Sequence, residues 1–304
     1  MTDEAFTDAE YALILRWQTP GPIADVARYA ATIAQWMPVT VIDASAPALA
    51  DAHARLLPAG VRHHRTGLTV PVGRHGDAHG VHTGLLPGLR PRVVIAAHDV
   101  RYDRATLAAA LDAAPEADIV LPQTVLRPQP WQARWDTARS LVTRAVVSPW
   151  FGGDESATAI ICRDTFHAVG GLESELLHDV PELQRTVASV GGEVVVALDV
   201  YVECLPPSVP RFWRQRVAQA HDSFAQPARV AGELALLPGI LLAARRPPML
   251  AAFALGTVLV AELGRRRAGG AEHYRADAAL WAPLWVAERA VGAWAAIARR
   301  ARRR

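Results

Sequence analysis

The stretch Arg92-Val-Val-Ile-Ala-Ala-His-Asp-Val-Arg-Tyr-Asp-Arg-Ala-Thr-Leu107 decides the fold. Residues 93–97 form a short, continuously apolar run, which is typical of a strand buried on both faces of a parallel sheet. Helical spacing resumes at Arg104, so we expect Asp99 at the carboxyl end of this strand, where open α/β sheets bind their ligands. A carboxylate there suits a divalent cation and the phosphate groups that the cation neutralises. The alternative is that Asp99 only caps the next helix.

The residues before this stretch predict the first half of a doubly wound nucleotide-binding fold. We expect a strand over residues 11–17, a helix over residues 23–34 and a second strand over residues 39–42 that ends in Asp43-Ala44-Ser45. Asp43 is therefore a second candidate for ligand binding at the carboxyl edge of the sheet. The alternative is an Asp–Ser turn, in which the carboxylate bonds its own backbone.

The residues after the stretch continue the alternation of helices and strands. We expect helices over residues 104–114 and 131–145, and strands over residues 117–123, 158–162, 193–198 and 200–205. The whole pattern predicts an α/β fold with a mostly parallel sheet flanked by helices.

Several of these segments resemble family 2 glycosyltransferases. Residues 97–103, Ala-His-Asp-Val-Arg-Tyr-Asp, are similar to the DxD region of that family, in which an acidic strand end holds the metal of a nucleotide-diphospho-sugar. Gly170-Gly171 with residues 172–176, then residues 177–185, and then residues 212–216, Phe-Trp-Arg-Gln-Arg, resemble later motifs of the family in the same order. The resemblance extends over residues 10–230 and implies a Rossmann-like GT-A fold.

The resemblance also implies which residues bind the donor. Asp99 would bind Mg²⁺ or Mn²⁺, and Asp43, in the acid-and-serine turn, would contact the nucleoside. Arg214, Gln215 and Arg216 would lie in the helix that closes the donor site, and the two arginines would hold the departing diphosphate.

The catalytic base implied by the resemblance lies in residues 177–185. Asp179 matches the first acid of the family motif, Val180 stands where the second acid is usual, and Glu182 is the other base candidate. Inverting transfer needs a base because the acceptor oxygen must lose a proton as it attacks. Three replacements motivate the alternative of a catalytically impaired GT-A protein that acts as a membrane-associated scaffold or partner. They are Ala97 for the first acid of DxD, Asp77 where the family's glycine-rich loop has a lysine, and Val180 for the second acid. A nucleotidyltransferase is a third alternative.

Composition and charge narrow the class of protein further. The chain has 304 residues, a net charge of +2 and 51% hydrophobic residues, so it is not a uniformly basic nucleic-acid binder. The first ten residues are acidic and lack the apolar core of a signal peptide, so we expect the amino-terminal part in the cytoplasm.

The last quarter of the chain is apolar with arginine clusters. Residues 230–244 and 249–264 are Ala/Leu/Val-rich runs separated by Arg245-Arg246-Pro-Pro248, and residues 277–298 contain three tryptophans. Each of the first two runs is short of the roughly 20 apolar residues that span a bilayer. Tryptophans beside arginines favour a helix in the membrane interface. A membrane hairpin, an in-plane helix pair and a helical cap folded on the catalytic domain all remain open.

These observations predict a GT-A-type domain over residues 1–229 and a membrane-associated helical tail over residues 230–304. The expected function is inverting transfer of a sugar from a nucleotide-diphospho-sugar to a hydroxyl of a lipid-linked or cell-envelope glycan. The expected location is the cytoplasmic face of the cell membrane.

Overall fold

The structure is a computed structural model that describes residues 6–17, 19–65, 90–147, 156–168, 187–213, 216 and 227–302. The chain divides into two compact units. The first comprises Met1–Thr124 and Ser156–Glu203, and the second comprises Val125–Glu155 and Cys204–Arg304. The predicted boundary between residues 229 and 230 separates a catalytic domain from a membrane-associated tail. The two units are compact groups of residues and do not test that separation.

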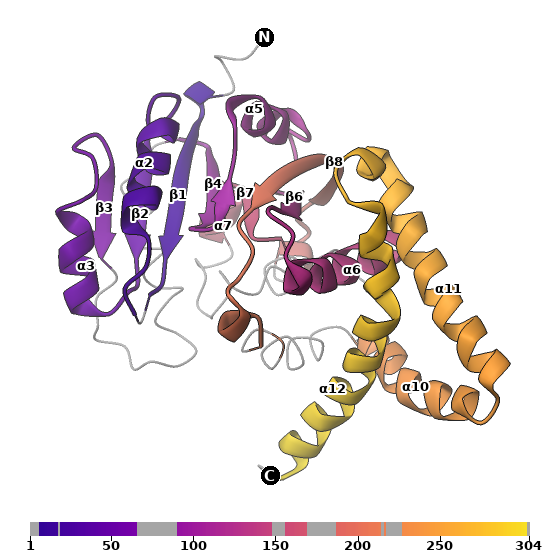
Figure 1. Ribbon diagram of the computed structural model, residues 1–304. Helices are drawn as coiled ribbons and strands as arrows, with labels where there is room; N and C mark the ends of the chain where they lie inside the picture. The colour runs from indigo at the N-terminus through magenta and orange to yellow at the C-terminus, as the bar shows by residue number, and fades with distance from the viewer. Residues whose placement is uncertain are drawn as a thin grey trace. The chain divides into compact units, whose positions relative to one another are not determined.

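The described residues contain an eight-stranded sheet in the order β3-β2-β1-β4-β7-β6-β8-β5 (Figure 1). The strands are β1 (Ala9–Leu15), β2 (Val39–Asp43), β3 (Arg62–Arg65), β4 (Arg92–Ala97), β5 (Val100–Arg101), β6 (Ile119–Leu126), β7 (Thr158–Cys162) and β8 (Val194–Cys204). β1 is parallel to β2 and β4, and β2 is parallel to β3. β7 is antiparallel to β4 and β6, so the sheet is mixed. The prediction of an α/β fold with a mostly parallel sheet is confirmed.

The central strands are buried on both faces, as their apolar runs require. Val93 and Ile95 of β4 belong to one core cluster, together with Ile14 of β1. Val94 and Ala96 point to the opposite face, since side chains alternate along a strand, and both are fully buried as well. Helices α2 (Ile23–Ile33), α3 (Pro47–Ala54), α5 (Arg104–Asp112) and α7 (Arg163–Ala168) belong to the same unit.

One strand differs from its prediction. The apolar run interrupted by Asp199 predicts two strands, over residues 193–198 and 200–205, but β8 is a single strand of 11 residues. That prediction was wrong because Asp199 lies on an exposed position of the strand, where a charge does not interrupt the ladder.

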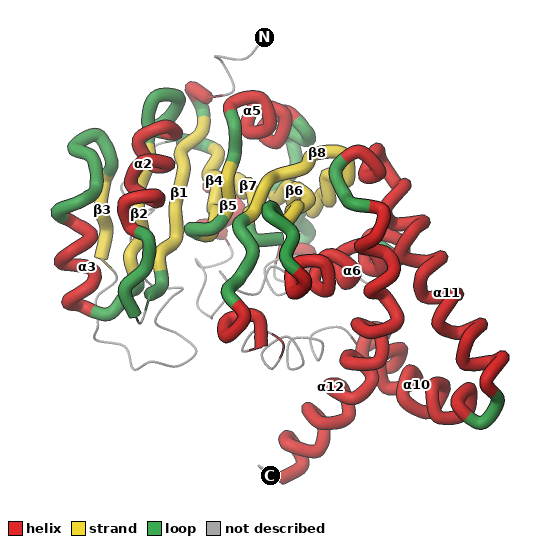
Figure 2. Tube along the Cα trace, in the orientation of Figure 1, coloured by secondary structure: helices red, strands yellow, loops and turns green. Residues whose placement is uncertain are grey.

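The second unit is helical. It contains α6 (Trp131–Val146), α10 (Pro227–Ala244), α11 (Pro247–Arg266), the 3₁₀ segments η2 (Arg267–Glu272) and η3 (Ala276–Trp281), and α12 (Ala282–Arg302) (Figure 2). The two apolar runs of the sequence thus form α10 and α11, a hairpin of two helices that diverge from a short turn (Figure 1). In the described part of the chain, one helical stretch, Pro247–Glu272, is long and apolar enough to cross a membrane, with a mean hydropathy of 1.5.

Candidate functional site

The carboxyl ends of three neighbouring parallel strands bring polar and aromatic side chains to one edge of the sheet. Trp17 follows β1, Asp43 ends β2, and His98 and Asp99 follow β4. The Trp17 ring stands edge-on to two imidazoles, with its centroid 5.2 Å from that of His53 and 5.3 Å from that of His98. Trp17 therefore joins the ends of β1 and β4 to α3 at the edge where α/β sheets bind ligands.

Asp43 is buried, and both of its carboxylate oxygens accept hydrogen bonds. The backbone N–H of Ser45 donates to Oδ1 over 3.0 Å, while Nδ1 of His53 and Nε2 of His63 lie 2.8 and 3.1 Å from Oδ2. Burial raises the pKa of the carboxyl group, but the hydrogen bonds from Ser45 and the histidines outweigh burial and hold the pKa below its ordinary value. The Asp–Ser turn is confirmed, and the nucleoside contact of Asp43 stays a prediction.

Asp99 is half-buried in the turn between β4 and β5. The N-cap of α5 is Asp103, whose carboxylate accepts a hydrogen bond of 2.7 Å from the backbone N–H of Thr106. The alternative in which Asp99 caps this helix is therefore wrong. The position expected for Asp99, directly after a buried parallel strand, is confirmed, and its metal-binding role stays a prediction.

Arg101 and Tyr29 hold the turn that carries Asp99. The Arg101 guanidinium donates to the carbonyl oxygens of His98 and Val100 over 2.7 and 2.8 Å, and it lies 4.7 Å from the centroid of the Tyr29 ring. The Tyr29 hydroxyl accepts a hydrogen bond of 2.8 Å from the backbone N–H of Tyr102. These contacts fix the backbone on both sides of Asp99.

The donor set at this edge fits a cation that arrives with phosphate. Among the described residues, no group of three or more His, Cys, Asp or Glu side chains is arranged to hold a metal ion. Both oxygens of Asp43 already accept hydrogen bonds, so Asp99 is the carboxylate candidate among the residues that the structure describes at this edge. Mg²⁺ is commonly held by one or two carboxylates together with substrate phosphates, rather than by a cage of protein ligands. A single carboxylate at a strand end is compatible with that kind of site.

Arg216 lies in the second unit, where its charge is balanced by neighbouring acids. Its guanidinium pairs with Asp136, lies 3.9 Å from a carboxylate oxygen of Glu288, and stacks 4.7 Å from the centroid of the Phe212 ring. Burial raises the pKa of Asp136, but Arg139 and Arg216 outweigh it and lower that pKa. The diphosphate contact of Arg216 stays a prediction. The remaining predicted site residues lie outside the described residues: Asp179, Glu182, Arg214 and Gln215.

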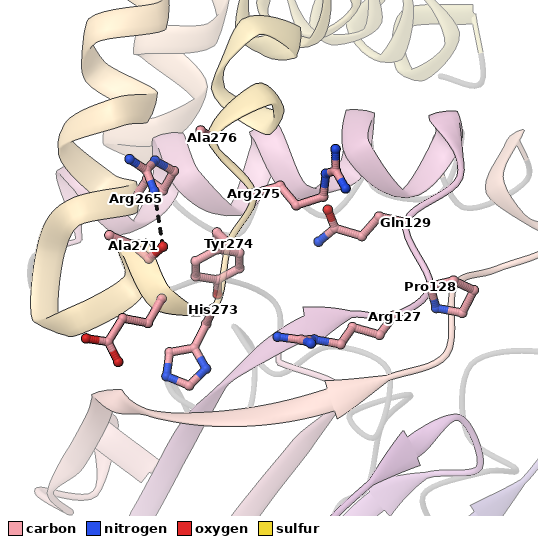
Figure 3. A pocket seen from close by; sticks show the side chains of 10 residues that line it. Arg127, Pro128, Gln129, Arg265, Ala271, His273, Tyr274, Arg275 and Ala276 are labelled. Carbon is pink, nitrogen blue, oxygen red and sulfur yellow. Dashed lines mark hydrogen bonds between the residues drawn. The ribbon is translucent and has the colours of Figure 1, made fainter.

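A separate pocket of about 580 Å³ lies within the second unit (Figure 3). It is lined by residues 127–129, Arg265 and residues 271–276. Two of its arginines have carboxylate partners. Arg265 binds both oxygens of Glu262 over 2.6 and 2.8 Å, and Arg275 binds both oxygens of Asp277 over 3.0 and 3.2 Å. Because these acids offset the guanidinium charges, the pocket is less basic than its lining suggests.

Sequence reasoning did not single out Trp17, His53 or His63 as site residues. Trp17 is the last residue of a predicted strand, and this position at a strand end was the one feature of the sequence that could have indicated a site residue. His53 and His63 lie 10 and 20 residues after Asp43, and only the fold brings their rings to the carboxylate.

No family model and no curated protein matches the chain. Among solved structures, it is similar to the mannosyltransferase PcManGT from Pyrobaculum calidifontis in complex with GDP-Man and Mn²⁺, with a TM-score of 0.50 and 19% identity over 93% of this chain and 86% of that chain. The fold is GT-A-like. Glucosyl-3-phosphoglycerate synthase from Mycobacterium tuberculosis, in complex with Mn²⁺, UDP and phosphoglyceric acid, is similar over 72% of this chain and 78% of that chain, at 15% identity and a TM-score of 0.42, which is too distant to add support.

Proposed function

We propose that this protein is a glycosyltransferase of the family 2 type, which transfers a sugar from a nucleotide-diphospho-sugar to a hydroxyl group with inversion at the anomeric carbon. The observation that carries the proposal is a GT-A-like fold with Asp43 and Asp99 at the ends of β2 and β4, the strands on either side of β1. Ligands of open α/β sheets bind at this edge, where strand order changes direction.

The donor would bind across the carboxyl edge of the sheet. Asp99 would hold Mg²⁺ or Mn²⁺ together with the donor phosphates, and the cation, when bound, offsets the charge that develops on the leaving diphosphate. Asp43 would position the nucleoside through the two imidazoles that it orients, those of His53 and His63, because its own oxygens are already hydrogen-bonded.

The transfer itself needs a base and a diphosphate clamp. In the proposed step, the acceptor oxygen attacks the anomeric carbon while the bond to the diphosphate breaks, and Asp179 or Glu182 takes the proton of the acceptor hydroxyl. Arg214, Gln215 and Arg216 would bind the diphosphate, because guanidinium groups suit phosphate oxygens, and Arg216 would exchange its pairing with Asp136 for the phosphate.

The proposed acceptor is a lipid-linked or cell-envelope glycan, used at the cytoplasmic face of the cell membrane. The support for this location is the large number of exposed apolar side chains on α10, α11 and α12, which water solvates poorly.

The test is calorimetric titration of the full chain, solubilised in detergent, with UDP- and GDP-sugars in the presence and absence of Mn²⁺. We expect metal-dependent binding that is lost in Asp99→Asn. Asp112→Asn is the matched control, because Asp112 is an exposed aspartate at the end of α5 in the same unit, and it should bind as the wild type does. Equal binding by Asp99→Asn and wild type would contradict the metal role. Absence of binding across the donor panel would favour the catalytically impaired scaffold.

A further inference from the structure

The turn that joins α10 to α11 is surrounded by exposed apolar side chains. Leu241, Leu242, Met249 and Leu250 are 61, 57, 48 and 39% exposed. Arg245 and Arg246 between them are exposed as well. These six residues are the hairpin tip, and Figure 1 shows the tip at the end of the hairpin away from α6. Four large apolar side chains exposed together at the end of a projecting element indicate an interaction surface.

The base of the hairpin, in contrast, is fixed to the rest of the second unit. On α11, Gly264 packs directly against the backbone of Leu141 in α6. Arg144 of α6, which is 1% exposed, donates hydrogen bonds of 3.2 and 2.7 Å to the carbonyl oxygens of Gly264 and Arg267. One carbonyl group in the last turn of α11, and the carbonyl group of its C-cap residue, are therefore bound by a buried guanidinium rather than by solvent.

The other helix of the hairpin is fixed to α12. Glu233, in the first half of α10, forms a buried ion pair of 2.8 Å with Arg289 of α12. The Trp294 indole N–H donates a hydrogen bond of 3.1 Å to the carbonyl oxygen of Leu234. Both helices are thus held at their bases, and the tip projects from an anchored support.

The positive charge of the hairpin tip favours a negatively charged partner. No acidic residue occurs between Glu233 and Glu262, so Arg245 and Arg246 carry the charge of that segment without a local counter-ion in the sequence. Two copies joined tip to tip would bring four guanidinium groups together. An anionic bilayer supplies both a negative surface for the arginines and hydrocarbon for the leucines.

We propose that the hairpin tip is a membrane-docking element that lies along one leaflet of an anionic bilayer, with the side chains of Leu241, Leu242, Met249 and Leu250 in the hydrocarbon and Arg245 and Arg246 bound to lipid phosphates. The docking does not depend on transferase activity. It also accounts for the exposed leucines at four-residue spacing along α11, Leu255, Leu259 and Leu263, which lie on one face of the helix and can rest against the membrane interface.

The anchored base argues against a helix that spans the bilayer. The part of α11 that precedes the buried Ala261 is about 21 Å long at 1.5 Å per residue, which is short of the roughly 30 Å of hydrocarbon core.

Vesicle co-sedimentation of the full chain, without donor, tests the apolar contribution. We expect the wild type to bind vesicles that contain phosphatidylglycerol and to bind phosphatidylcholine vesicles poorly. The double variant Leu242→Glu/Leu250→Glu should bind at least roughly 30-fold more weakly, because two leucines lose their burial in hydrocarbon. The matched control is Leu56→Glu, which changes a leucine of similar exposure, 54%, in the first unit and should bind as the wild type does.

The arginine contribution is tested with Arg245→Ala/Arg246→Ala in the same assay. We expect binding about 30-fold weaker than wild type at physiological salt, because each arginine near an anionic surface contributes on the order of a fivefold gain. Far-UV circular dichroism should match wild type for all these variants, since every substituted side chain is exposed.

Three results would overturn the proposal. The first is wild-type affinity of the leucine variant for anionic vesicles, and the second is absence of wild-type binding to either kind of vesicle. The third concerns the variant Arg245→Cys, added to sealed vesicles and treated with a maleimide that does not cross membranes. A shallow tip leaves this cysteine reactive from outside, so its protection, read at that peptide by mass spectrometry, would contradict the proposal. A dimer in light scattering that the leucine variant converts to monomer, without vesicle binding by wild type, would assign the tip to a second copy instead.

Discussion

Gly264 is the point at which α11 meets α6, and its replacement by alanine tests the packing of the second unit. A Cβ atom at this position would overlap with the carbonyl oxygen of Leu141 and would come within 3.0 Å of the backbone nitrogen of Ala145. Both atoms belong to the backbone of a helix and cannot rotate away, so the two helices must move apart. Gly256, in the same helix, has open space around its Cα and provides the matched control.

Overpacking of this kind costs about 1–3 kcal/mol, and a backbone contact belongs near the upper end. Alanine in place of glycine within a helix raises the free energy of unfolding by roughly 0.5–1 kcal/mol. The net change for Gly264→Ala should therefore be a loss of about 2 kcal/mol in the free energy of unfolding, whereas Gly256→Ala should gain about 0.5–1 kcal/mol. For a chain of this size, that corresponds to a fall in Tm of roughly 4–8 °C for Gly264→Ala and a rise of roughly 1–4 °C for Gly256→Ala.

The assay is thermal unfolding followed by far-UV circular dichroism, with spectra at low temperature to show that both variants fold. If Gly264→Ala unfolds at or above the temperature of Gly256→Ala, then α11 does not pack on α6 through Gly264, and the reasoning about the anchored hairpin fails with it.

Three further substitutions probe the first unit. Glu10→Ala removes the buried partner of Arg163 and should destabilise the protein by about 3 kcal/mol or more, measured by urea unfolding; a loss below about 1 kcal/mol would contradict the buried pair. Asp43→Asn should be less stable than wild type at pH 7, because the folded carboxyl has a pKa below its ordinary value of 3.8. The Asp43 carboxylate stabilises the fold fully above that ordinary value and loses its contribution as pH falls through the folded pKa, so the difference in stability between Asp43→Asn and wild type should shrink below about pH 4; a constant difference would rule out the linkage. Asp103→Ala removes the N-cap of α5 and should cost about 1 kcal/mol in the same unfolding assay, with no loss expected if the cap does not form.

The fold followed from the sequence wherever burial imposes an apolar run. The strand expected over residues 158–162 is β7, Thr158–Cys162, and the central strand differs from β4 by one residue at its start. β3, with the sequence Arg-His-His-Arg, has no apolar residue, and no pattern in the sequence predicts it as a strand. It forms because it pairs with β2 at the edge of the sheet, where one flank needs no hydrophobic cover.

The site was predictable only as far as strand ends are predictable. Asp43 and Asp99 are expected at the carboxyl edge because each follows an apolar run, and the structure places both there. Their partners were not predictable, since contacts such as Asp43 with His63 or Arg216 with Asp136 join residues 20 and 80 positions apart. The spacing of residues along one helix or strand does not indicate which distant residues will pair.

The one-sided fixing of α11 has a mechanical consequence. The helix is about 30 Å long, and a tilt of roughly 10° at Gly264 would displace its free end by about 5 Å, which is one helical turn. The contact between Gly264 and the carbonyl oxygen of Leu141 is thus the point about which such a tilt would turn. Docking of the free end on a membrane would therefore be felt at Leu141 of the tryptophan-bearing helix α6.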